Sequence, residues 1–72
     1  MTKARRWKVL EDAGYTATDI AEEMGKHKGS VARVLNGETF SLPIAEKLAE
    51  VCGTTVIEMF PKAPRRVLRT AA

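Results

Sequence analysis

The sequence predicts an all-α domain of five short helices, and three features lead to that class. Apolar residues recur at helical spacing in five separate runs, and no stretch alternates apolar and polar residues over the length of a useful β-strand. Glycine follows four of those runs, and helices commonly end at glycine. A chain of 72 residues is long enough for one domain with a small core.

The first two helices are placed by their terminating and capping residues. Residues 3–13 contain neither Gly nor Pro and carry apolar side chains at helical spacing up to Gly14, so we expect the first helix there. Thr16 is a favourable N-cap residue, and Asp19 follows three positions later as in a capping box. The second helix is therefore expected over 17–24.

The remaining helices follow after short connections. A third helix is expected over about 28–35, because three apolar residues lie on one face there and an Asn-Gly turn signal follows. Ser41 is expected to cap a fourth helix that tolerates Pro43 in its first turn and runs to Gly53. A short fifth helix, 56–60, ends at a proline. We expect residues 1–60 to form the domain and residues 61–72 a basic, flexible tail.

Positive charge is concentrated at the two ends of the chain. The formal net charge is +3, with four cations before residue 9 and four after residue 61. The segment between them holds four cations against nine carboxylates, a net charge of −5. Basic ends of this kind suit a polyanionic partner such as nucleic acid, whereas a simply solvated terminus is the alternative for the tail.

Composition argues against several classes of protein. No apolar run approaches the roughly 20 residues of a membrane span, and nothing near the N-terminus resembles a signal peptide, so we expect a cytoplasmic protein. The single cysteine, Cys52, has no partner for an internal disulfide and is expected in the core. No residues show zinc-ligand spacing or a phosphate-binding glycine loop, so no metal, cofactor or enzyme activity is expected.

The second and third expected helices, joined by a turn at 25–27, have the arrangement of a helix-turn-helix. The residues that carry the pattern are YTATDIAEEMG at 15–25, VARVLNG at 31–37, the run 41–53 and the segment 56–60. Over about residues 7–60 the chain resembles the Cro/repressor helix-turn-helix family, and it is similar to small Ner-like phage regulators. The resemblance implies a compact five-helix fold and a regulator that binds double-stranded DNA through its third helix.

The resemblance also implies which residues would contact the bases. The start of the third helix and its next outward turn read base edges in this family, which corresponds here to Lys28, Gly29, Ser30, Ala32 and Arg33. Arg33 is the strongest candidate, because a guanidinium can donate two hydrogen bonds to guanine O6 and N7.

Phosphate contacts are expected on either side of that helix. The free amides at the start of the second helix favour an anion there. The expected phosphate-contacting residues are Thr16, Ala17, Thr18, Lys26, His27, Asn36, Arg5 and Arg6. His27 stands where relatives carry a small hydroxyl cap, so its imidazole is expected to cap the third helix or to neighbour a phosphate. Glu38 departs from relatives that carry a basic residue after the Asn-Gly, and it would repel a nearby phosphate.

Two groups of residues have a structural and a functional interpretation. Trp7, Tyr15 and Phe60 are possible stacking surfaces for single strands, but the spacing of Trp7 and Phe60 favours the core. The carboxylates of the second helix are most simply a solvated face, although a similar patch contacts RNA polymerase in some phage repressors.

The function expected from the sequence is a transcriptional regulator, as a repressor of phage or mobile-element type in the nucleoid of a bacterial or phage-infected cell. We expect a homodimer on paired half-sites, meeting near Val56, Ile57 and Met59. The alternative is an antitoxin or a protein-interaction adaptor that uses the same fold.

Overall fold

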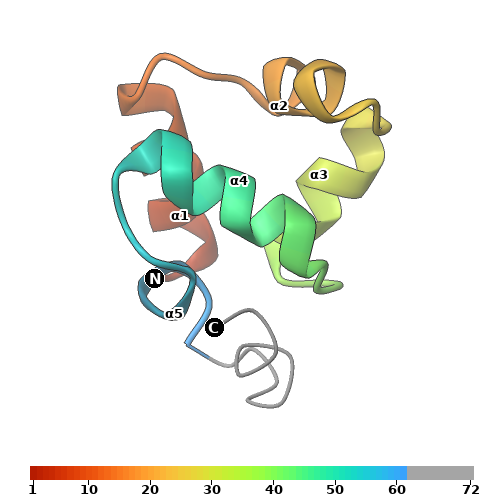
Figure 1. The fold of residues 1–72 in the computed structure, drawn as a ribbon. Coiled ribbons are helices and arrows are strands. Elements are labelled where there is room, and N and C mark those ends of the chain that lie inside the picture. The colour runs from red at the N-terminus through yellow and green to blue at the C-terminus, as the bar shows by residue number, and fades with distance from the viewer. Residues whose placement is uncertain (62–72) are drawn as a thin grey trace.

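Five short helices make up the fold, as the sequence predicts (Figure 1). The computed structural model describes residues 1–61, and the predicted basic tail from residue 62 onward lies outside this range. The helices are α1 (Lys3–Asp12), α2 (Ala17–Met24), α3 (Lys28–Asn36), α4 (Leu42–Cys52) and α5 (Val56–Met59). None of these helices has the length and apolar character needed to cross a bilayer.

Three helices begin at threonine side chains that accept a hydrogen bond from a first-turn amide. Thr2 accepts from Arg5 N and so caps α1, and Thr55 caps α5 in the same way. At α2 the capping box is complete, because the Thr16 hydroxyl accepts from Asp19 N and the Asp19 carboxylate accepts from Thr16 N. The expected boundaries of α2 are confirmed.

Two other residues stand at the expected N-cap positions, but their side chains do not cap the helix. Ser41 is the N-cap residue of α4 and His27 that of α3, yet neither side chain makes a capping bond. At Ser41 only one of the two usual donors is available, because an N-cap oxygen accepts from the second or third amide of the helix and Pro43 in second place has no N–H. His27 was expected either to cap α3 or to neighbour a phosphate, and the first of these two alternatives is wrong because its imidazole makes no capping bond.

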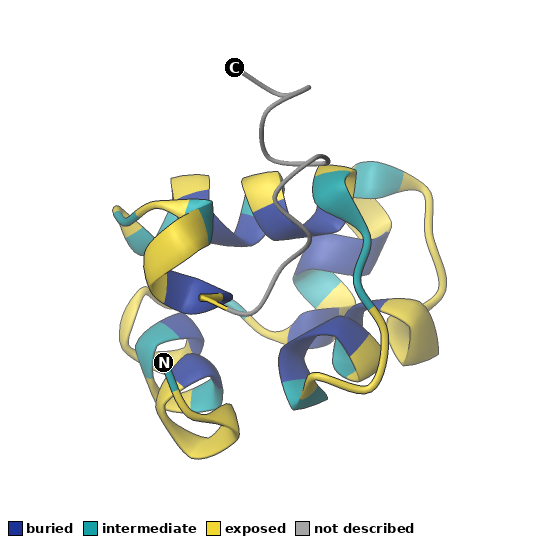
Figure 2. Ribbon diagram, turned by 90° about the horizontal axis from the view of Figure 1, so that it is seen from below, coloured by how far each residue is buried: buried dark blue, intermediate teal, exposed yellow. Residues whose placement is uncertain are grey.

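The core is formed by one buried stripe from each helix. Helix α4 runs through the middle of the molecule and contacts the other four helices, with α2 and α3 on one side and α5 beside the N-terminus (Figure 1). In Figure 2 the buried faces of the helices turn inward. The side chains with the least exposure are Leu10, Ile20, Val31, Val34, Leu35, Leu48 and Met59.

The aromatic residues and the cysteine are distributed around this core. Phe60 is buried, as expected, and meets Phe40 edge to face with 5.9 Å between ring centroids. Trp7 and Cys52 are half-buried at the edge of the core rather than inside it. Burial nonetheless raises the pKa of the Cys52 thiol above its ordinary value.

Candidate nucleic-acid interface

Helices α2 and α3 are joined by a turn whose geometry depends on Gly25. This residue has φ +65°, and Lys26 N donates across it to Ala21 O at 2.8 Å, which closes the last turn of α2. A left-handed conformation at the end of a helix strongly favours glycine. The chain can therefore reverse direction within three residues and begin α3 at Lys28.

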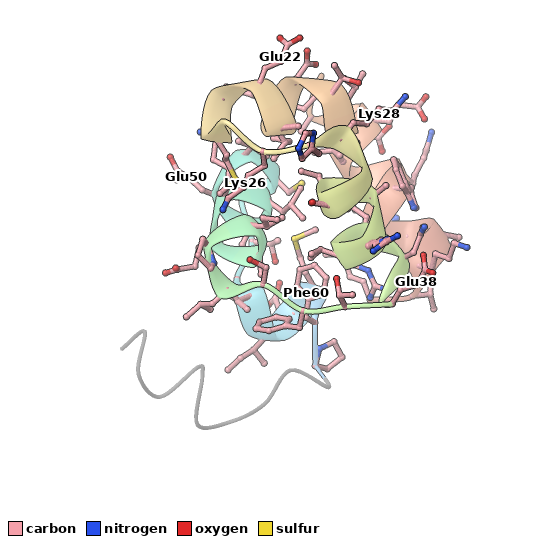
Figure 3. The ribbon with its side chains drawn as sticks, turned by 90° about the vertical axis from the view of Figure 1, so that its right-hand side faces the viewer. Glu22, Lys26, Lys28, Glu38, Glu50 and Phe60 are labelled. Carbon is pink, nitrogen blue, oxygen red and sulfur yellow. The ribbon has the colours of Figure 1, made fainter. Side chains whose placement is uncertain are left out.

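Helix α3 has one face in the core and the other in solvent. Val31, Val34 and Leu35 are 0–1% exposed, so they fix the helix to the rest of the domain. Lys28, Ser30 and Arg33, which are expected to contact bases, are exposed. Ala32 is half-buried, so only part of its methyl group belongs to the exposed face of α3. In Figure 3 Lys28 lies at the start of α3, and Glu38 lies beyond its other end.

Gly29 leaves a gap in the side chains on the exposed face of α3. It is exposed and helical, and a Cβ built on it would meet no heavy atom of the neighbouring structure within 4 Å. Neither packing nor a positive φ requires glycine here. Whatever approaches this face can come closer to the helix backbone at Gly29 than at its neighbours.

The N-terminus of α2 offers less to a phosphate than the sequence implied. Thr16 and Thr18 are exposed, but the side chain of Ala17 is buried. The Asp19 carboxylate already accepts from Thr16 N at 2.9 Å and places a negative charge at this helix end. The amides of Ala17 and Thr18 have no partner inside the helix, so these two remain as donors.

The C-terminal end of α3 is held by a residue of α1. The Trp7 indole Nε1 donates to Asn36 Oδ1 at 2.8 Å, and Asn36 Nδ2 donates in turn to Glu38 Oε2 at 3.3 Å. Asn36 was expected to contact a phosphate, whereas its side-chain amide is engaged on both sides in the structure. No sequence signal pointed to the Trp7 contact.

Arg6 lies inside the domain, so the expectation that it contacts a phosphate is wrong. It is only 8% exposed, and its guanidinium donates to three backbone carbonyls, Leu35 O at 2.7 Å, Met1 O at 2.7 Å and Met59 O at 3.1 Å. Its Cζ also lies 5.1 Å from the centroid of the Phe60 ring. Burial lowers the pKa of Arg6. The available signal was its position four residues before Leu10, on the core face of α1.

The other basic residues assigned to phosphate have exposed side chains. Arg5 lies on the outer side of α1, beside buried Arg6, and Lys26 and His27 lie in the turn before α3. All three side chains are exposed to solvent, and Lys26 and His27 directly precede the first residue of α3.

The acidic face of α2 is partly neutralised by α4. Lys47 Nζ lies 3.0 Å from Glu23 Oε1, and this hydrogen bond is the main reason that the pKa of Lys47 is raised. Glu22 is exposed at the outer edge of α2 in Figure 3. The structure thus leaves Glu22, more than Glu23, as the open carboxylate of this face.

The expected dimer surface is smaller than the sequence implied. Ile57 is 61% exposed, whereas Val56 is half-buried and Met59 is fully buried. Met59 belongs to the core, so its assignment to a subunit interface is wrong. Within residues 1–61, no three or more His, Cys, Asp or Glu side chains form a group that could hold a metal.

Comparison with known proteins agrees with this geometry. Residues 8–59 match the helix-turn-helix family. The chain is also similar to the antitoxin HigA-1 of Vibrio cholerae serotype O1, with 41% identity over 46 residues. That alignment covers 64% of this chain and 44% of the relative, so this chain spans less than half the length of that protein. No solved structure matches the chain.

Proposed function

Because this chain belongs to the helix-turn-helix family, we propose that it is a sequence-specific transcriptional regulator that inserts α3 into the major groove. The family is one of DNA-binding regulators rather than of enzymes. The observation that carries the proposal is the exposure of Lys28, Ser30 and Arg33 on a helix whose opposite face is fixed in the core. The major groove admits one α-helix, and a rigidly held helix can read it without being ordered first.

The exposed residues of α3 take different roles. Arg33 donates two hydrogen bonds to a guanine, a contact that discriminates against the wrong base by about 1–3 kcal/mol. Lys28 contacts a base or a phosphate, and Ser30 contacts either. Gly29 and Ala32 add no hydrogen-bonding side chain, so sequence discrimination depends mainly on Arg33 and Lys28.

Phosphate contacts position α3 in the groove but carry no sequence information. Arg5, Lys26 and His27 supply side-chain donors, and Thr18 with the free amides at the start of α2 supplies others. Arg6 is left out because its guanidinium is occupied inside the domain.

The test is a binding assay with the DNA immediately upstream of the protein's own gene and an unrelated duplex of equal length as competitor. The wild-type protein is expected to prefer the upstream DNA. Arg33→Met and Lys28→Met should lose most of that preference. Lys8→Met is the matched control, because Lys8 is exposed on α1 beside Asp12, 3.4 Å away, and is not part of α3. Equal preference in all four proteins would reject the proposal.

We propose further that the regulator is a repressor of phage or mobile-element type and binds as a homodimer to paired half-sites. A single module of this size forms a small interface with DNA, and pairing two modules increases both affinity and selectivity for spacing. Exposed Ile57 is the natural centre of the protein contact. Ile57→Glu should therefore lower affinity for a two-site duplex but leave affinity for a single half-site unchanged.

A second candidate function is supported by the similarity to HigA-1, which its name describes as an antitoxin. In that case the chain would also bind and neutralise a toxin. Coexpression with the product of the neighbouring gene tests it: rescue of growth with formation of a stable complex would favour an antitoxin. DNA binding without rescue of growth would favour a regulator that does not act as an antitoxin.

A further inference from the structure

The side-chain amide of Asn36 is held between two elements at the end of α3. The Trp7 indole is a donor only, so its 2.8 Å bond requires Asn36 to present Oδ1 towards α1. The amide nitrogen Nδ2 must then face the other way, towards exposed Glu38. Asn36 Nδ2 is therefore an outward-facing hydrogen-bond donor at the end of α3. In the proposed interface this is where a DNA phosphate would accept a hydrogen bond.

We propose that the Glu38 carboxylate occupies this donor in place of a DNA phosphate and thereby weakens DNA binding. The inference rests on the proposed function, because it assigns to Glu38 the control of affinity at the same interface. Carboxylate and phosphate are both anionic acceptors for an amide N–H, so they compete for Asn36 Nδ2. The carboxylate also repels any phosphate that approaches this helix end.

The charge of Glu38 is not neutralised within the part of the chain that the structure describes. The two ion pairs found in residues 1–61 join Lys8 to Asp12 and Lys47 to Glu23. Glu38 belongs to neither pair. No ion pair of the described residues offsets this charge, so the carboxylate repels a DNA phosphate that approaches the end of α3.

Displacing Glu38 requires no change in the core. The residue is exposed, and it follows Gly37, which has φ +78° and ends α3. A hollow of about 510 Å³ lies beside it, lined among others by Lys3, Thr39 and Phe40. The carboxylate can swing away into open space, so its effect is a lowered affinity rather than a blocked site.

Two substitutions separate the charge from the hydrogen bond. Glu38→Gln keeps an acceptor for Asn36 but removes the charge, whereas Glu38→Ala removes both. Two unit charges about 4 Å apart in water repel by an amount equivalent to about a fivefold change in affinity, which is the gain expected for Glu38→Gln at low salt. Glu38→Ala should gain more, because it also frees Nδ2. The gain should shrink as salt is raised, since the repulsion is screened.

The measurement is fluorescence anisotropy with a labelled mixed-sequence duplex of two helical turns, about 20 base pairs, because phosphate contacts do not depend on sequence. Glu50→Gln is the matched control. It removes the same charge from α4, and Glu50 lies at the opposite edge of Figure 3 from Glu38. The emission of Trp7, the only tryptophan, reports in each variant whether the contact to Asn36 is kept.

Tighter binding by both Glu38 variants, with Glu50→Gln unchanged, would support the inference. Equal gains for Glu38→Gln and Glu38→Ala would overturn the competition for Asn36. If wild type binds the duplex and neither Glu38 variant binds more tightly than Glu50→Gln, Glu38 does not control affinity and the inference fails alone. If the wild type binds neither this duplex nor the DNA upstream of its own gene, the proposed function fails as well.

Discussion

Arg5 and Arg6 are adjacent arginines of α1, and the structure gives them opposite roles that one pair of substitutions can separate. Arg6→Met keeps an apolar stem against Phe60 but leaves the carbonyl of Leu35 without a donor inside the domain, and leaves Met59 O only the long 3.5 Å contact from the N-terminal amine of Met1. An unsatisfied buried acceptor costs about 1–3 kcal/mol, so the loss of the donor to Leu35 O alone should lower the free energy of unfolding of Arg6→Met by about 1–3 kcal/mol. Domains of this size are stable by only several kcal/mol, so the loss is a large part of the total.

The assay is urea denaturation followed by helical circular dichroism, with the stability taken from the midpoint and slope. Arg5→Met is the matched control, since Arg5 is exposed and a surface change away from special features shifts stability by about 0.5 kcal/mol or less. In DNA binding we expect the opposite order, with the larger effect from Arg5→Met. Arg5→Met should reduce the salt dependence of log K by about 0.9 if Arg5 neutralises one phosphate. The reasoning is refuted if Arg6→Met is as stable as Arg5→Met.

Two further predictions concern α3 and α4. Gly29→Ala should raise the free energy of unfolding by about 0.5–1 kcal/mol, because alanine favours a helix and a Cβ meets open space there; an unchanged or lower urea midpoint would contradict this. Burial raises the pKa of Cys52 above its ordinary value of 9.0, so the unfolded chain ionises first and stability should fall as pH rises through 9 and above. Cys52→Ala should show a shallower fall over this pH range in the same urea assay, and an identical slope would refute the assignment to Cys52.

The helices were predictable from the sequence because local signals specified them. The capping box of Thr16 and Asp19, the helix-ending glycines and the period of the apolar residues act within a few positions, and they placed all five helices to within about a turn. The exposure of Lys28, Ser30 and Arg33 followed from the burial of Val31 and Val34 on the other face.

The errors at Arg6 and Met59 concern contacts between residues far apart in the chain. Arg6 was assigned to DNA because its charge was considered without its position, but it meets carbonyls 29 and 53 residues away. Met59 was assigned to a dimer surface, yet α5 turns it into the core. A short helix carries too few residues for its period to show which face is buried. Tertiary packing decided both cases.

Asn36 shows a different limit. An Asn-Gly pair after a helix predicts a turn, and the turn is present. Whether the Asn side chain faces solvent depends on what lies opposite it, and Trp7 reaches it from 29 positions earlier. The phosphate contact expected for Asn36 therefore remains a proposal that now involves Glu38 as well.

The proposed recognition of DNA requires that α3 lies in the major groove with Arg33 against a guanine. Methylation interference tests this directly, because dimethyl sulfate methylates guanine N7, the atom that faces the major groove. In wild-type complexes with the preferred duplex, methylation of particular guanines should prevent binding, and Arg33→Met should abolish the interference at one of them while leaving the others. If guanine N7 methylation has no effect, or if the pattern is the same for Arg33→Met, then α3 does not read the bases as proposed.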